Sequence, residues 1–359
     1  MIKFYTYCLP FKAAFKTASD SFKHREGILI EATFDEQVVL CEASPLPGFS
    51  KESFSDVART LLQYQDQVDS FLKTDFTVKG LNQFLKKIPQ LPSLQFSLSY
   101  LGLQILAGRK SCSLNDLFNI STPQSVFANE IIGSSSVDNI VPDIEAGVKQ
   151  GFQTFKCKAR YPLQRLVEAL KIAIRTYPDI IIRFDANQSW PEHELESINT
   201  LCRELPLQYI EEPVPLKEKH GIEKVKSVLT TPIAADESIN DIETLDELLR
   251  HHPDLFIIIK PMLLGNLIDL FETIYSHRST FKKVVVTTSL ESVIGRKMIL
   301  SSAFLLGDPT FAHGLNTGKL FTTDLTHYQP KLNASTYKSG DQEPLQLHDI
   351  KTSLIKPLR

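Results

Sequence analysis

Several features that define other protein classes are missing from this sequence. Its longest apolar runs, DIIIRF and LFIIIKP among them, have the length of a strand and are too short for a membrane-spanning helix. The five cysteines include no C-x-x-C pair, and no H-E-x-x-H occurs, so neither a zinc site nor a disulfide framework is indicated. Lysine and arginine (39) do not outnumber aspartate and glutamate (42), which argues against a nucleic-acid partner.

Nucleotide-binding glycine motifs and a secretion signal are also missing. Neither G-x-G-x-x-G nor G-x-x-x-x-G-K occurs, and no apolar segment near the N-terminus leads to a small-residue cleavage site. With 42% hydrophobic and 23% charged residues, the composition is that of an ordinary globular protein, expected in the cytoplasm and away from membranes. A length of 359 residues favours one large domain with a smaller companion.

The order of predicted strands and helices changes near residue 123. Residues 1–122 contain strand-like runs followed by helical patterns, which is typical of a small α+β domain. Residues 123–319 alternate short apolar strands with amphipathic helices through seven units, and TFAHGLNT supplies an eighth strand. This alternation predicts an α/β fold, a modified (β/α)7β barrel of the TIM type. An open doubly wound sheet is the alternative, disfavoured because the nucleotide motif is missing.

Ionisable residues end five successive predicted strands. They are Lys158, Asp185, Glu211, Asp236 and Lys260, at steps of 27, 26, 25 and 24 residues. All strand ends of a β/α barrel open on one face, so we expect these side chains to gather there. Lys156, two residues before Lys158, shares its face of the strand.

The residue types in this set indicate metal-assisted proton abstraction. Asp185, Glu211 and Asp236 offer only oxygen ligands, which suit Mg²⁺, or Mn²⁺ as a substitute. Such a cation stabilises the enediolate that forms when a carbon beside a carboxylate loses its proton. A cation and a second amine nearby lower the pKa of a lysine, so Lys158 is predicted to be the base and Lys156 to tune it.

The ordered set K-x-K, D-x-N, E-E-P, D-E-S and K-P resembles the enolase superfamily, in its muconate lactonizing enzyme subgroup. The resemblance implies that residues 1–122, completed by 320–359, form a capping domain over the barrel of 123–319. Within the subgroup, four segments resemble the o-succinylbenzoate synthases: PLPGFSKES, RFDANQSW, TTSLESVIG and GLNTG. That family dehydrates 2-succinyl-6-hydroxy-2,4-cyclohexadiene-1-carboxylate in menaquinone biosynthesis, as a Mg²⁺-dependent lyase.

The resemblance also implies roles for further residues around the substrate. Lys260 would lie across the substrate from the other lysines, where a cation–π contact with a planar intermediate is expected. Arg183 would help to hold the substrate, and Thr288 with Ser289 would bind its succinyl carboxylate at the start of a helix near Glu291. Simple helix capping is the other interpretation of this pair. Phe22 lies in a segment (17–27) that resembles a site-closing loop and would shield the pocket, with a plain surface hairpin as the other interpretation. Asn187 and Glu237 complete the prediction as residues behind the metal ligands.

Two other interpretations stay open. Racemisation of N-succinylamino acids or epimerisation of dipeptides would also use Lys158 and Lys260, as bases on opposite faces of an α-carbon. A non-catalytic ligand-binding barrel is the third interpretation, disfavoured because it has no need for unpaired charges at the strand ends. All three imply a small-molecule ligand and no nucleic acid, and the sequence leaves monomer and homo-oligomer both open.

Overall fold

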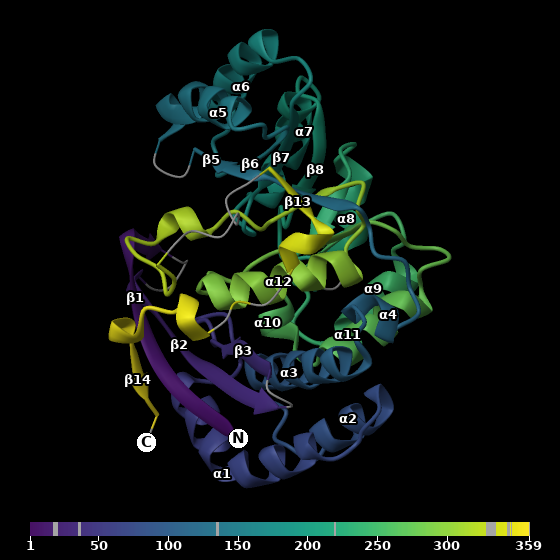
Figure 1. Cartoon of the computed structure of the whole chain (residues 1–359). Coiled ribbons are helices and arrows are strands. Elements are labelled where there is room, and N and C mark those ends of the chain that lie inside the picture. The colour runs from purple at the N-terminus through teal and green to yellow at the C-terminus, as the bar shows by residue number, and fades with distance from the viewer. Residues whose placement is uncertain are drawn as a thin grey trace.

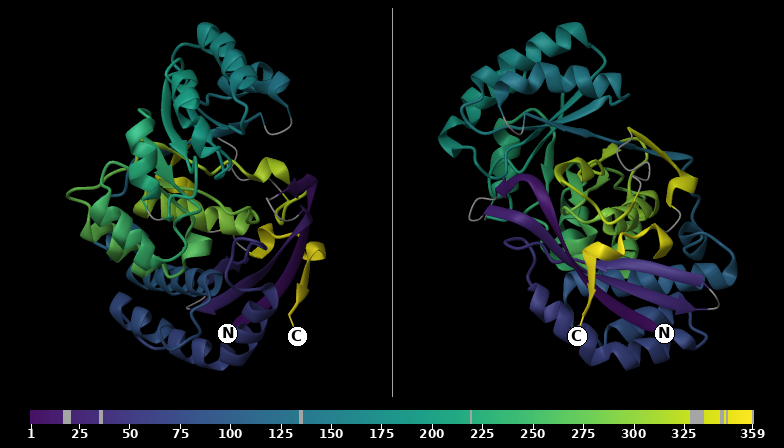
Figure 2. Two further views of the ribbon diagram at one scale, coloured as in Figure 1. Left: turned by 180° about the vertical axis from the view of Figure 1, so that it is seen from behind. Right: turned by 60° about the vertical axis from the view of Figure 1, so that its left-hand side comes forward.

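A computed structural model describes residues 1–16, 21–34, 37–133, 136–218, 220–327, 335–342, 345 and 347–358 (Figure 1). Its N-terminal part is an antiparallel sheet with helices packed on it, and its larger part is a ring of parallel strands with helices outside (Figure 2). The predicted α/β class with an N-terminal α+β capping domain is confirmed. The division at residues 122 and 319 stays a prediction.

The capping sheet has the strand order β14-β1-β2-β3. Its first three strands are β1 (Ile2–Lys16), β2 (Ser21–Phe34) and β3 (Gln37–Ala43), and β1 and β2 extend beyond the short runs expected from the sequence. The C-terminal strand β14 (Ile355–Pro357) pairs antiparallel with β1, so the end of the chain returns to the capping sheet.

One buried helix joins the capping sheet to the barrel. The capping helices are α1 (Phe54–Lys73), α2 (Val78–Leu85), α3 (Pro92–Lys110) and α4 (Leu114–Leu117). Most of α3 is buried, because it packs on β3 and α1 on one side and on the barrel helices on the other (Figure 1). Its buried serine hydroxyls form hydrogen bonds. Ser97 donates to the carbonyl of Ser93, and Ser99 accepts from the amide of Leu267 in the barrel.

The barrel strands follow one another in chain order. They are β4 (Ser125–Ala128), β5 (Glu130–Ile132), β6 (Thr154–Lys158), β7 (Ile181–Asp185), β8 (Leu207–Glu211), β9 (Ile233–Ala235), β10 (Phe256–Ile259), β11 (Val284–Val286) and β12 (Ala312–His313). Strands β5 to β11 form one parallel sheet, and β12 pairs parallel with β4. The Gly314 amide donates to the Val286 carbonyl, and the Asn129 amide donates to the His313 carbonyl. The eighth strand predicted from TFAHGLNT therefore closes the barrel.

Helices cover the outside of the barrel. They are α5 (Ile140–Lys149), α6 (Gln164–Thr176), α7 (Leu195–Cys202), α8 (Gly221–Val228), α9 (Ile242–His251), α10 (Pro261–Leu264), α11 (Leu267–Ser276) and α12 (Val293–Leu306). Alternation along the strands separates two cores. One lies beneath these helices, and a small one inside the barrel consists of Tyr209, Ala234, Phe256, Ile258 and Val285. The inward positions one step beyond this inner core carry the charged residues.

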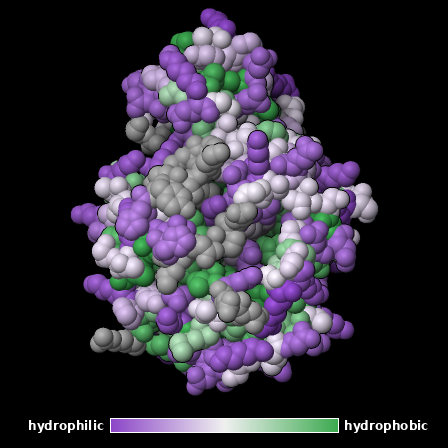
Figure 3. Space-filling view, in the orientation of Figure 1, coloured by the Kyte–Doolittle hydropathy of each residue, from purple (hydrophilic) through white to green (hydrophobic). Residues whose placement is uncertain are grey.

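The C-terminal segment contacts both parts of the molecule. Strand β13 (Thr336–Lys338) pairs antiparallel with β4 of the barrel, whereas β14 pairs with β1 of the capping sheet. On the face shown in Figure 3, hydrophilic residues predominate and apolar ones are scattered among them. No helix in the described part of the chain is both long and apolar enough to cross a membrane.

Candidate active site

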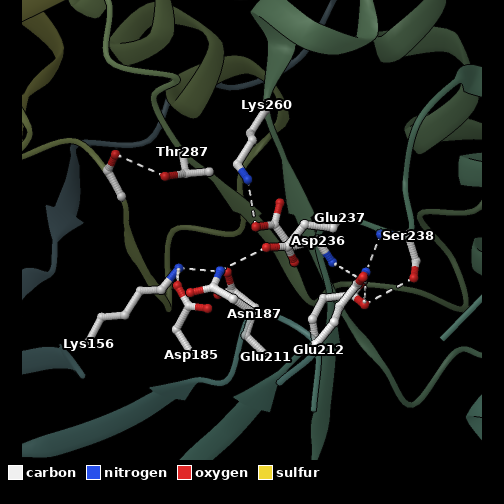
Figure 4. A network of polar contacts seen from close by, with 12 residues as sticks. Lys156, Asp185, Asn187, Glu211, Glu212, Asp236, Glu237, Ser238, Lys260 and Thr287 are labelled. Carbon is white, nitrogen blue, oxygen red and sulfur yellow. Dashed lines mark hydrogen bonds and ion pairs between the residues drawn. The ribbon is translucent and has the colours of Figure 1, made fainter. Parts of the chain in front are cut away.

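The structure brings the six charged residues at the strand ends together at one mouth of the barrel (Figure 4). Lys156 and Lys158 lie on β6, while Asp185 and Glu211 are the last residues of β7 and β8. Parallel pairing sets Lys158 level with Asp185, and Asp185 level with Glu211. Asp236 and Lys260 follow directly after β9 and β10. Each step in the sequence therefore corresponds to one strand, the helix that follows it and their two connections.

The ammonium groups lie between the carboxylates. Lys156 Nζ is 2.6 Å from Glu211 Oε1 and 3.0 Å from Asp185 Oδ2. Lys158 Nζ is 2.7 Å from the same oxygen of Asp185, and Lys260 Nζ is 2.6 Å from Asp236 Oδ2. Each carboxylate predicted to bind the metal is therefore ion-paired, through one of its oxygens, with a lysine predicted to take part in catalysis.

Burial and charge set the protonation of this cluster. Burial opposes the charge of Lys156, but Asp185 and Glu211 outweigh it and hold its pKa well above the usual value. Burial likewise opposes the charge of Lys260, while Asp236 and Glu237 raise its pKa to about 12. Burial also acts against Asp185, yet Lys156 and Lys158 hold the pKa of this carboxyl below its usual value. The pKa lowering that the sequence predicts for an amine here requires a bound cation, because these carboxylates act in the opposite direction.

Lys158 is the most accessible of the three lysines. Its side chain is 41% exposed, against 17% for Lys156 and 20% for Lys260. Besides Asp185, it donates to the side-chain oxygen of Asn187 at 2.7 Å. Among the three amines, Lys158 is thus the one best placed to meet a ligand that enters from outside.

Polar residues behind the carboxylates link neighbouring strand ends (Figure 4). Asn187 donates to Glu237 at 2.8 Å, which places both predicted supporting residues in one chain of contacts with Lys158. Glu212 points away from Glu211 and accepts from the amides of Asp236 (2.9 Å) and Ser238 (2.8 Å). Burial raises the pKa of Glu212 to about 7. Its carboxylate fixes the backbone that carries Asp236.

The donor set fits a divalent cation. Three buried oxygens, Asp185 Oδ1, Glu211 Oε2 and Glu237 Oε2, have no hydrogen-bond partner among the described residues. Buried oxygens of this kind are normally satisfied, so they indicate a missing positive partner. Within the described ranges no three carboxylates already converge as ligands, since the ammonium groups lie between them. All available donors are oxygens, which is the preference of Mg²⁺.

Arg183 lies deeper than its predicted role requires. It is fully buried one layer below Asp185, where its guanidinium stacks on the Tyr209 ring at 4.8 Å and donates to the Ala312 carbonyl at 2.7 Å. These contacts belong to the floor of the barrel. They favour a structural role for Arg183 over direct contact with a substrate.

The expected helix start after β11 is wrong by two residues. Helix α12 begins at Val293 and is capped by Ser292, so Thr288 and Ser289 are not its caps. The first amides of α12 already donate to protein groups, among them Asp324 for Val293 and Glu42 for Gly295. This helix end therefore has no amide left for a succinyl carboxylate.

Thr288 and Ser289 still lie at the rim, but in the turn that precedes the helix. The Thr288 hydroxyl lies 2.9 Å from the Thr317 hydroxyl and donates to the Gly314 carbonyl at 3.1 Å. The Ser289 hydroxyl oxygen is buried and has no partner among the described residues. Of the pair, Ser289 keeps a hydroxyl free for another group.

The capping domain contains a cavity whose lining residues all belong to that domain. This cavity, of about 630 Å³, is lined by Phe22 and other residues of β2, together with the segment after β3 and the first turn of α1. Part of the predicted closing segment, 17–20, lies outside the described residues. Phe49, which was not singled out in the sequence, lies 5.9 Å below the Lys260 ammonium and connects this segment to the site. Its place within PLPGFSKES was the available signal.

Comparisons with known proteins agree with this geometry. Residues 1–104 match the family described as MenC, N-terminal domain, and residues 140–270 match the enolase C-terminal domain-like family. The o-succinylbenzoate synthase of Pasteurella multocida is 24% identical over 99% of this chain and 97% of its own. The L-amino acid-D/L-Glu epimerase of Sulfurimonas denitrificans is 23% identical over 83% of this chain and 86% of its own.

A solved structure shares the whole fold. The dipeptide epimerase of Enterococcus faecalis, complexed with Mg and the dipeptide L-Leu-L-Tyr, has a TM-score of 0.80 and 18% identity, covering 99% of this chain and 98% of that one. Two domain matches that together span most of the chain, and a barrel with carboxylates between lysines at its mouth, lead to one assignment. The chain belongs to the enolase superfamily, with the lysine arrangement expected of the muconate lactonizing enzyme subgroup.

Proposed function

We propose that this protein is an o-succinylbenzoate synthase, a lyase that removes water from 2-succinyl-6-hydroxy-2,4-cyclohexadiene-1-carboxylate and supplies menaquinone biosynthesis. The observation that carries the proposal is the position of the lysines around three carboxylates. Lys156 and Lys158 lie on one side of these carboxylates, and Lys260 lies on the other. The match of residues 1–104 to the MenC N-terminal domain supports this reaction over others of the superfamily. This domain also carries Phe49, whose ring centroid lies 5.9 Å from the Lys260 ammonium, and this contact links the domain to the proposed site.

Asp185, Glu211 and Asp236 would hold a Mg²⁺ ion, which Mn²⁺ could replace. When bound, this ion supplies Lewis-acid stabilisation to the enediolate oxygens of the substrate. Lys156, displaced from the carboxylates, would donate to the substrate carboxylate. Ser289 offers its free hydroxyl to the succinyl end.

Lys158 would carry out both proton transfers on one face of the ring. Its neutral amine takes the proton from the ring carbon that bears the carboxylate, and the electron pair of that C–H bond moves into the carboxylate to give the enediolate. As this pair returns, it forms the third ring double bond between that carbon and its hydroxyl-bearing neighbour, the C–O bond breaks, and the Lys158 ammonium gives its proton to the departing hydroxide. One water leaves for each substrate, and the amine is regenerated. Lys260, on the opposite wall, would place its positive charge over the planar intermediate.

Turnover of freshly prepared 2-succinyl-6-hydroxy-2,4-cyclohexadiene-1-carboxylate tests the proposal directly. Ultraviolet absorbance should report the aromatic product with Mg²⁺ present and lose that signal after excess chelator, then recover when Mg²⁺ is restored. A folded protein that binds Mg²⁺ without forming the product would overturn the assignment.

A second function, racemisation of N-succinylamino acids or epimerisation of dipeptides, is favoured by one observation. Lys158 and Lys260 lie on opposite sides of the carboxylates, as two bases acting on one α-carbon must. The Lys260→Ala variant separates the two reactions. Dehydration should slow by roughly 10²-fold through the loss of charge stabilisation. Racemisation should stop, and deuterium should exchange into only one enantiomer of the substrate.

A further inference from the structure

A buried carboxylate of the capping domain binds the first residues of the barrel helix α12. Glu42 of β3 is fully buried, and its Oε2 accepts from the Gly295 amide at 3.0 Å and from the Ser292 hydroxyl. Its Oε1 accepts from the Ser292 amide at 3.1 Å, and from Tyr7 (2.6 Å) and Ser44 (2.7 Å) within the capping domain. Five donors from both domains therefore converge on two oxygens. A negative charge at a helix N-terminus is favourable, which adds to these contacts.

An arginine of the capping domain holds the preceding turn. Arg25 of β2 is 2% exposed, and its Nε donates to the Leu290 carbonyl at 3.1 Å, while one terminal nitrogen lies 3.5 Å from the Ser289 carbonyl. Its other hydrogen bonds go to carbonyls of its own domain, including that of Pro45 at 2.6 Å. Leu290 has a φ of 64°, a left-handed backbone that a β-carbon disfavours. The turn is thus kept in an unusual conformation by contacts from outside the barrel.

The absence of a side chain at Gly295 allows the Glu42 carboxylate to come close to the start of α12. A Cβ at this position would lie 2.9 Å from the carboxyl carbon of Glu42 and would also meet Glu291. The ES-x-x-G pattern inside TTSLESVIG is therefore matched to Glu42, which lies some 250 residues away in the chain. The turn from 288 to 292, clamped at its carbonyls by Arg25 and at its amides by Glu42, carries Ser289 at the rim of the site.

We propose that Glu42 and Arg25 are positioning residues that act through the 288–292 turn, so that the capping domain sets the affinity of the site for the distal end of its substrate. The effect on affinity rests on the proposed function, whereas the effect on the turn does not. Neither residue touches the carboxylate and lysine cluster in the described structure. Their influence is therefore expected on KM and not on the proton transfers.

Glu42→Gln is the most direct variant. An amide nitrogen cannot accept a hydrogen bond, so either the Gly295 amide or the Ser292 amide must lose its partner while the side-chain volume is kept. Glu31→Gln is the matched control. Glu31 is also buried in the capping sheet at 2% exposure and bonds to Lys3 (3.1 Å) and Tyr5 (3.0 Å), but not to the barrel. Ser292→Ala provides a milder change on the barrel side of the same contact.

Hydrogen exchange followed by mass spectrometry measures how well the amides of the 288–292 turn are protected, and it needs no substrate. Peptides that cover 287–296 should exchange at least about fivefold faster in Glu42→Gln than in Glu31→Gln. Steady-state kinetics should show KM raised about tenfold and kcat changed less than about threefold in Glu42→Gln, with a smaller KM increase in Ser292→Ala.

The outcomes separate the two proposals. Should the wild-type protein not turn over the proposed substrate, hydrogen exchange alone decides, and equal exchange in Glu42→Gln and Glu31→Gln overturns the positioning role. With turnover present, an unchanged KM in both Glu42→Gln and Ser292→Ala overturns it, whatever the exchange rates. Equal losses of kcat and thermal stability in Glu42→Gln and Glu31→Gln would assign Glu42 to general stability alone.

Discussion

At the scale of single residues, Lys156 and Lys158 show how one strand face produces two different amines. Lys156 is wedged between Asp185 and Glu211, so carboxylates hold its pKa high. Lys158, one pleat nearer the rim, has an exposed side chain and the amide oxygen of Asn187 as its second partner. A base must exchange its proton with an incoming ligand, and only the outer position gives access. Depth along the strand therefore favours Lys158 over Lys156 as the proposed base.

Replacing Lys158 with Ala should reduce turnover by roughly 10³-fold or more, since it removes the proposed base. Far-ultraviolet circular dichroism should stay unchanged, because the side chain is 41% exposed and packs against no core. Lys149→Ala is a suitable control, as Lys149 is an exposed lysine paired with Glu145 on α5. Turnover retained within about tenfold in Lys158→Ala would rule out its role as the base.

Residue-level prediction from the sequence worked where local spacing carries the information. Steps of 24 to 27 residues fixed which side chains meet, because each step is one strand, one helix and two turns. The partner of Gly295 could not be predicted, since Glu42 lies in another domain and no local pattern connects them. The depth of Arg183 could not be predicted for a related reason. The alternation of side chains along β7 predicts that Arg183 points into the barrel. How deeply its guanidinium lies depends on its contacts with Tyr209 and the Ala312 carbonyl, which are distant in the sequence.

At the scale of elements, helix α12 depends on close packing against the capping domain. Gly295→Ala should lower the free energy of unfolding by about 1–3 kcal/mol, because the new methyl group must displace the Glu291 side chain, which lies nearest, and the Glu42 carboxylate. Gly80→Ala in α2 is the control, since its Cβ would meet only the Thr77 hydroxyl, at 3.4 Å. There the same change should stabilise by about 0.5–1 kcal/mol. Urea unfolding of both variants would test this, and equal effects would contradict the proposed packing.

Glu291, in the turn before α12, should make stability depend on pH. Burial, and then the neighbouring Glu42 charge, raise its pKa from 4.5 to about 7, although Arg25 and the Ser289 amide oppose the rise. Between these values the folded protein keeps a proton that the unfolded chain releases, so stability falls as pH rises from about 4.5 to about 7. Glu291→Gln stays neutral and should lose this contribution. Urea midpoints should favour the variant more at about pH 8 than at about pH 5, and a constant difference would contradict the assignment.

The start of α12 marks the limit of prediction at this scale. Local signals suggested a helix near Glu291, because Thr288 and Ser289 are good capping residues. The observed cap is Ser292, and the extra turn exists because Arg25 and Glu42 bind its carbonyls and amides from the capping domain. Tertiary contacts thus moved a boundary that propensity placed elsewhere.

At the scale of the whole molecule, barrel closure followed from the sequence and the join between the domains did not. Seven strand-helix units leave one gap, which only an eighth strand can fill, and β12 fills it. The burial of α3 and the pairing of β13 with β4 and of β14 with β1 join segments that are far apart in the chain. Such contacts depend on shape and not on a repeating pattern, and they determine how the capping domain packs on the barrel.

A divalent cation should therefore stabilise the whole molecule and not only its site. Asp185, Glu211 and Glu237 each hold a buried oxygen that has no hydrogen-bond partner in the described part of the chain. A ligand that binds only the folded state stabilises it by about 2.7 kcal/mol at a concentration of 100 Kd. Differential scanning fluorimetry should show a rise in melting temperature of a few degrees with saturating Mg²⁺, reversed by chelator. Glu211→Gln should abolish the rise, whereas Glu31→Gln should keep it because the hydrogen bonds of Glu31 go to Lys3 and Tyr5 of the capping sheet. A melting temperature that does not respond to Mg²⁺ in the wild-type protein would contradict the metal assignment and, with it, the stabilisation of an enediolate at this site.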